Sequence, residues 1–149
     1  MTLRNAFLTA SLVSTLAATP APSNSPEPPT TAISLFAAVE EAWSGSDAER
    51  LGSLVDTTAV RISIKPGTPL ATAPTRVAVT FLLQDQLRLV HTSEFRVTRF
   101  DCDAKRGICR AYATWNGDWG GRQGTRAAKV TLTARPRSGR WLLTEIRAD

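Results

Sequence analysis

The sequence predicts an α+β domain in which N-terminal helices pack on one face of a curved antiparallel sheet. Apolar residues recur at helical spacing between residues 33 and 55 and again between residues 74 and 86. A short alternating run at 59–64 separates these helices, and four longer strand-like runs follow them. Helices gathered before a run of antiparallel strands are typical of the α+β class.

Residues 1–21 have the layout of a secretory signal peptide. Arg4 precedes an apolar run from Ala6 to Ala18, and small residues continue to Ala21. The run is shorter than the roughly 20 apolar residues of a membrane-spanning helix. We therefore expect cleavage after Ala18 or Ala21, a periplasmic or extracellular protein, and no integral membrane segment after processing.

Residues 22–31 are rich in proline and contain no large apolar side chain, which predicts a disordered linker. The remaining residues, 32–149, are enough for one domain.

Three helices and one strand are expected in the first part of this domain. The first helix buries Leu35, Phe36, Val39 and Trp43. A capping box formed by Ser46 and Glu49 opens the second helix, which buries Leu51, Leu54 and Val55. The strand turns Val60, Ile62 and Ile64 inward. The third helix, 74–86, turns Val77, Phe81 and either Leu82 or Leu83 inward.

The only two cysteines, Cys102 and Cys109, flank a turn-like segment between two strand-like runs. In an exported protein this spacing predicts a disulfide across a β-hairpin. A metal or redox pair is the alternative, but it would need further cysteine or histidine partners, and the chain has one histidine.

The stretch TWNGDWGGRQGTR, residues 114–126, fits either a tight turn at Asn116 and Gly117 or a loop over 117–124. The tight turn would place Gly120, Arg122 and Gly124 opposite inner-face residues of the preceding strand. The longer loop instead pairs Ala113 with Ala128, Ala111 with Val130 and Cys109 with Leu132. Because it gives one continuous apolar face, we favour the longer loop.

Pairing Cys102 with Cys109 also places Phe100 opposite Ala111 and Thr98 opposite Ala113. Extending the pairing to the last strand, with Val130 opposite Ile146 and Ala134 opposite Leu142, leaves an apolar set on the outer face of the sheet. Its members are Phe95, Val97, Tyr112, Trp141 and Leu143. Such a patch is typical of a partner surface, so we hypothesise a homodimer through it. The alternative is that the N-terminal linker or a helix covers it.

The formal net charge is +5, and fifteen of the eighteen basic residues are arginine. The basic residues are concentrated in the second half of the chain, which suits either a surface for polyanions or an ordinary solvated face. Export and the lack of a recognisable binding motif argue against nucleic acid as a partner.

No catalytic or metal-binding motif is present in the sequence, and we expect no cofactor or metal ion. His91, the only imidazole, and Asp118 are weak candidates for a general base. Asp56 is expected to cap or turn the chain. Trp115, Trp119, Arg122 and Arg126 are expected to meet at the 117–124 loop, where the tryptophans offer flat contact area and the arginines hold an anionic group.

The order of elements, the LVDTTAVRI passage into the first strand and the closing SGRWLLTEI resemble the nuclear transport factor 2-like superfamily. This is the cone-shaped, cystatin-like fold shared with ketosteroid isomerase-like proteins, and the similarity is greatest to small secreted bacterial members of unassigned function. It covers residues 33–146. The resemblance implies a pocket at the open end of the cone and, often, dimerisation through the outer sheet face.

Two functions remain open at this point, because this fold hosts enzymes and binding modules alike. The favoured one is a non-catalytic exported domain that binds a small ligand or protein partner, or assembles through its sheet. The alternative is a ketosteroid isomerase-like isomerase, dehydratase or hydrolase with His91 or Asp118 as base.

Overall fold

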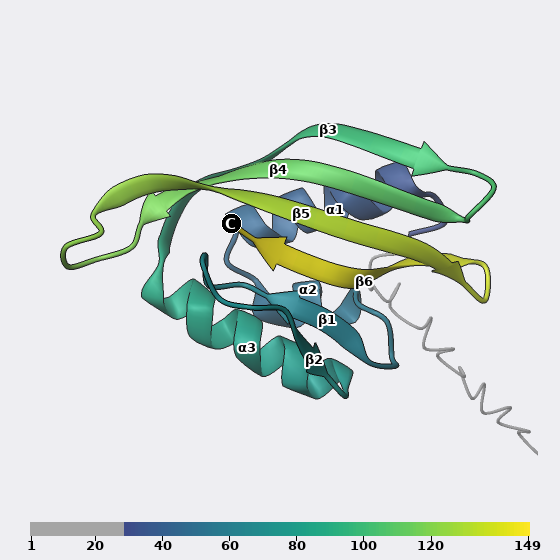
Figure 1. The fold of residues 1–149 in the computed structure, drawn as a ribbon, viewed down its shortest axis with the longest axis horizontal. Helices are drawn as coiled ribbons and strands as arrows, with labels where there is room; N and C mark the ends of the chain where they lie inside the picture. Colours follow the sequence, from purple (N-terminus) through teal and green to yellow (C-terminus); the bar gives the residue numbers. More distant parts are fainter. Residues whose placement is uncertain (1–28) are drawn as a thin grey trace, which may run out of the picture.

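The computed structural model describes residues 29–149 (Figure 1). The signal peptide predicted at 1–21 and residues 22–28 of the predicted linker lie outside the described residues. The elements, in chain order, are α1 (Ala32–Ser44), α2 (Ala48–Ser53), β1 (Val60–Ser63), β2 (Ala71–Ala73), α3 (Arg76–Leu89), β3 (His91–Asp103), β4 (Ile108–Asp118), β5 (Thr125–Arg137) and β6 (Arg140–Ala148).

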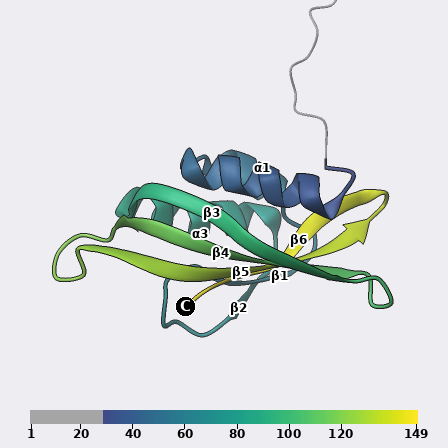
Figure 2. The same ribbon diagram turned by 90° about the horizontal axis from the view of Figure 1, so that it is seen from above.

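The strands form one sheet in the order β2-β1-β6-β5-β4-β3. Neighbours are antiparallel except β1 and β6, which run parallel. The sheet curves, and α1 lies across one of its faces (Figure 2). The predicted α+β class is confirmed. Within 29–149, no helix is long and apolar enough to cross a bilayer.

The first two helices bury the faces that the sequence predicts. Leu35, Phe36, Val39 and Trp43 of α1 are buried, as are Leu51, Leu54 and Val55 in and after α2. The predicted capping box is wrong. Asp47, not Ser46, is the N-cap of α2, because its Oδ1 accepts a hydrogen bond from the Arg50 N–H at 2.9 Å.

Helix α3 buries a different face from the one predicted. Val77 and Phe81 are 64% and 66% exposed, whereas Val79, Leu83 and Leu87 are buried. The helix carries two apolar stripes, so its sequence alone does not select one. The contact between α3 and α2 determines which stripe is buried. A Cβ atom on Gly52 would overlap Thr80 Oγ1, so the two helices approach closely at this point.

Two irregularities in the sheet move residues between its faces. Between Val97 and Arg99 the pairing shifts, so that Val97, not Thr98, lies opposite Ala113, and Phe95 lies opposite Trp115. The predicted β5–β6 pairs are also wrong: Leu132, not Val130, lies opposite Ile146, and a second shift places Leu143, not Leu142, opposite Ala134. A β-bulge has this effect because one extra residue reverses the alternation of side chains beyond it.

The apolar outer patch predicted from the sequence is therefore wrong in its members. Phe95 and Leu143 are core residues, and Val97 and Trp141 are partly buried against the core. The Arg99 guanidinium lies over the Tyr112 ring, 4.4 Å from the ring centre. The grounds for a dimer through this face are correspondingly weaker.

The predictions for the two hairpins β3–β4 and β4–β5 are confirmed in part. Cys102 and Cys109 form the disulfide, and Phe100 pairs with Ala111 as expected. The tight turn is excluded, since Asn116 and Gly117 lie inside β4. The predicted β4–β5 register is wrong by two residues: Ala113 pairs with Val130, Ala111 with Leu132 and Cys109 with Ala134, and the loop covers 119–124 rather than 117–124.

Large aromatic side chains pack between the C-terminal end of α1 and the sheet. The Trp43 ring stacks on Phe95 with centroids 4.5 Å apart and meets the Trp115 ring edge-on at 5.2 Å. All three residues are buried. This part of the cone is a packed core.

Candidate functional site

A pocket of about 610 Å³ lies at the end of the sheet where the β4–β5 loop meets the C-terminal end of α3. We call it the loop pocket. The segment between β1 and β2 completes its wall. It is lined by Lys65, Pro66, Gln86, Leu89, Val90, Trp119, Gly120, Gly121, Arg122, Gln123 and Arg126.

Two contacts hold the Trp119 side chain in the loop pocket. Its ring packs on that of Trp115 with centroids 4.6 Å apart, and the Arg126 guanidinium lies 4.5 Å from its centre in a cation–π contact. Trp115 is itself anchored, because its Nε1 donates to Thr92 Oγ1 at 2.9 Å. Trp115 is buried and absent from the lining, so it supports Trp119 from beneath.

All the charged residues that line the loop pocket are basic. Lys65, Arg122 and Arg126 line it, and no aspartate or glutamate does. None of the three forms an ion pair with a carboxylate in the described part of the chain. Cations gathered without acidic neighbours create a positive potential that attracts anions.

Hydrogen bonds within the loop define its shape. The Trp119 N–H donates to Gly124 O at 3.0 Å, and Asp118 Oδ1 accepts from the Gly120 N–H at 2.9 Å. Gly120 and Gly121 have φ angles of 70° and 55°, in the left-handed region that favours glycine. The consecutive glycines thus allow the turn that brings Arg122 to the pocket.

Gly117 has a different role from the turn that the Asn-Gly pair suggested. A Cβ atom here would lie 2.8 Å from Val90 Cγ1 and 2.9 Å from the His91 carbonyl oxygen. The glycine permits this close approach of β4 to the α3–β3 junction, which forms one wall of the loop pocket.

The two weak candidates for a general base lie together, but outside the core. His91 and Asp118 are opposite each other in the β3–β4 pairing, and both are exposed. Asp118 follows the inward-facing Gly117, so its side chain belongs to the outer face of the sheet. Its carboxylate is engaged with the loop through Gly120.

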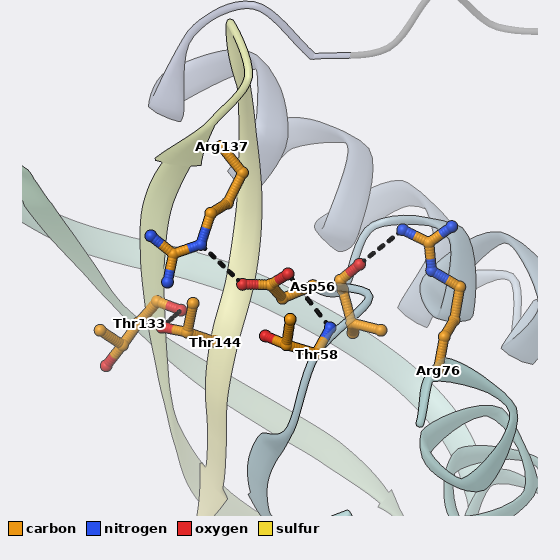
Figure 3. Close-up of polar contacts among 7 residues, drawn as sticks. Asp56, Thr58, Arg76, Thr133, Arg137 and Thr144 are labelled. Carbon is orange, nitrogen blue, oxygen red and sulfur yellow. Dashed lines mark hydrogen bonds and ion pairs between the residues drawn. The ribbon is translucent and has the colours of Figure 1, made fainter. Parts of the chain in front are cut away.

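Among residues 29–149, the most deeply buried carboxylate belongs to Asp56, which is 3% exposed. Figure 3 shows its contacts. Its Oδ2 accepts a hydrogen bond from Arg137 Nε at 2.9 Å, and its Oδ1 accepts one from the Thr58 N–H at 3.3 Å. Burial opposes the charged form, but the hydrogen bonds from Arg137, Thr58 and Thr57 outweigh it and lower the pKa of Asp56.

Asp56 therefore ties separate parts of the fold together. Its own N–H donates to Leu143 O at 2.8 Å, which joins the α2–β1 connection to β6. On the other side, Arg76 Nη2 donates to Val55 O at 2.8 Å and attaches the start of α3 (Figure 3). The turn-forming role expected for Asp56 agrees with its bond to Thr58, whereas the Arg137 partner, 81 residues away, left no sequence signal.

Lys65 is the charged pocket residue that the sequence analysis did not predict. It closely follows β1, in a KPGTP segment that reads only as a break in the strand. Within 29–149, no group of three or more histidine, cysteine, aspartate or glutamate residues could hold a metal ion.

No protein-family model and no curated protein matches the sequence. Solved structures do match in fold. A DUF4783 family protein from Bacteroides ovatus is 15% identical, with a TM-score of 0.63 over 76% of this chain and 92% of that one. A hypothetical protein with a ketosteroid isomerase-like fold from Catenulispora acidiphila, in complex with trimethylamine, is 16% identical, with a TM-score of 0.62 over 80% of this chain and 86% of that one. These similarities, with the helices and curved sheet described above, show that the chain has the nuclear transport factor 2-like fold.

Proposed function

We propose that the protein is a non-catalytic, exported domain that binds a small anionic ligand in the loop pocket. The observation that carries this proposal is that three cations, Lys65, Arg122 and Arg126, line the same pocket as Trp119, with no acidic residue in the lining. An arginine can bind a carboxylate or phosphate through two parallel N–H donors, which gives orientation as well as attraction.

The pocket suits a ligand with an apolar body beside its charged group. Leu89, Pro66 and Val90 form an apolar part of the lining, and the Leu89 side chain is exposed there. Trp119 adds a flat surface that is already fixed between Trp115 and Arg126. A surface that is ordered before binding costs less conformational entropy when a ligand arrives.

Export is supported by the disulfide, because disulfides persist in oxidising compartments. It agrees with the signal peptide expected at 1–21.

No observation in the described residues favours the ketosteroid isomerase-like alternative. Aromatic rings fill the core between the C-terminal end of α1 and the sheet, and the buried Asp56 carboxylate is engaged by Arg137. His91 and Asp118, the other candidates, are exposed.

The test is a titration with naphthalene-2-sulfonate followed by calorimetry, with naphthalene-2-methanol as the neutral analogue. We expect saturable binding of the anion and much weaker binding of the alcohol. Arg122→Gln should weaken anion binding about tenfold, since a hydrogen bond to a charged group contributes about 1.5–3 kcal/mol.

The matched control is Arg135→Gln, the same substitution on β5 outside the pocket lining, and it should leave binding unchanged. Equal affinity for the anion and the alcohol, or equal losses in the two variants, would refute an anion site in this pocket.

A further inference from the structure

Strand β3 forms a free edge of the sheet, and helix α1 protects only half of it. Edge strands present unpaired N–H and C=O groups that can pair with another chain. Glu40 Oε2 accepts a hydrogen bond from the Val97 N–H at 2.7 Å, and Ser44 Oγ donates to Phe95 O at 3.2 Å. Side chains of α1 therefore engage the outward backbone of β3 at Phe95 and Val97.

The other half of the edge begins at Phe100. Cys102 and Cys109 have Cα atoms 4.0 Å apart, a short separation that is typical of a non-hydrogen-bonded antiparallel pair. Phe100 lies two residues earlier, opposite Ala111, so this pair is also of the non-hydrogen-bonded kind. The N–H and C=O of Phe100 therefore point away from β4, toward the free edge of the sheet.

A groove with apolar and polar lining residues runs beside this unprotected edge. It has a volume of about 730 Å³ and lies between α1 and β3. Ile33 and Phe36 line it from the helix, and Phe100 lines it from the strand. Ile33 is 60% exposed and Phe100 is 46% exposed, so a large apolar surface lies next to free backbone groups. We call these features together the β3 edge.

We propose that the β3 edge pairs with the β3 edge of a second copy of this chain, antiparallel and across a two-fold axis at Phe100. The N–H and C=O of each Phe100 would then bond those of Phe100 of the partner subunit. The same pairing places Arg99 opposite Asp101 of the partner subunit, and Asp101 opposite the partner's Arg99. Both ion pairs lie on the outer face, with the phenyl rings on the inner one.

The charge pattern explains why the partner is a second copy and why this register is chosen. Arg99 and Asp101 flank Phe100 with opposite signs, so the segment is complementary to itself when reversed, as a two-fold interface requires. Moving the axis to Asp101 would set two like charges directly opposite each other, which is destabilising. The pairing does not depend on the loop pocket.

Sedimentation equilibrium of the exported chain tests the proposal. We expect a dimer at about 100 μM, and single variants Arg99→Asp and Asp101→Arg that associate at least tenfold more weakly. An equimolar mixture of the two single variants should dimerise again, because the two acidic side chains of one variant then face the two basic side chains of the other. The double variant R99D/D101R should also dimerise, since both pairs are merely reversed.

The control Arg135→Asp changes the charge equally on β5 and should leave the dimer intact. Circular dichroism and thermal unfolding establish that each variant is folded. Hydrogen exchange gives a separate readout: the Phe100 amide should be protected in the dimer and exchange faster in each single variant, while the Val97 amide, held by Glu40, should not change.

Three results would overturn the proposal. One is a wild-type chain that stays monomeric at this concentration. Another is a dimer that persists in both single variants, since it must then form elsewhere. The third is a mixture of the single variants that does not associate.

Discussion

Replacing the Asp56 carboxylate with an amide, Asp56→Asn, should destabilise the fold at neutral pH. The residue is 3% exposed, and the amide keeps its size while removing the charge that binds Arg137. A hydrogen bond to a charged group contributes about 1.5–3 kcal/mol, and the Arg137 side chain is half-exposed, which weakens the interaction. We expect a loss of about 1–2 kcal/mol in the free energy of unfolding.

Urea unfolding at pH 7 measures this loss directly as a lower midpoint. Arg137→Gln is the informative companion variant. It removes the exposed partner and leaves a buried carboxylate without its cation, so it should cost at least as much as Asp56→Asn. The double variant should cost less than the sum of the two, because the residues form one contact.

The pH dependence supplies a second check. The pKa of Asp56 is lower in the folded than in the unfolded state, so the carboxylate contributes stability that is fully present above its unfolded pKa, about 3.9. This contribution is lost as the pH falls through the folded pKa. The difference between wild type and Asp56→Asn should therefore be constant near neutrality and shrink in acid. Equal stabilities at pH 7, or a difference that does not change down to about pH 2, would refute the reasoning.

Two further predictions concern the packing of α3. Gly52→Ala should destabilise the fold by about 1–3 kcal/mol, because the added methyl group overlaps Thr80 Oγ1, and the double variant G52A/T80A should recover part of this loss in urea unfolding. A double variant no better than Gly52→Ala alone would contradict this contact. Leu83→Ala should cost about 2–5 kcal/mol, whereas Phe81→Ala on the exposed stripe should cost far less; equal losses in thermal unfolding would show that the buried face is misassigned.

The site could be predicted only in outline. Trp119, Arg122 and Arg126 are close in the sequence and line the pocket together, so local reasoning found them. Lys65 comes from a distant segment and has no pattern of its own. Trp115 is expected from the sequence to contact a ligand because tryptophan offers a large flat surface. Its inward position in β4 instead makes it part of the core.

The sequence by itself determined the features that depend on near neighbours: the α+β class, the buried face of α1, the Cys102–Cys109 disulfide and a loop in place of a tight turn. Only the tertiary structure decided which face of the sheet Phe95 and Leu143 occupy, since a β-bulge reverses the alternation without a local signal. It also selected one of the two apolar stripes of α3 and brought Arg137 to Asp56. Each of these outcomes depends on how closely two distant segments approach, and that distance is not encoded in the spacing of residues along either one.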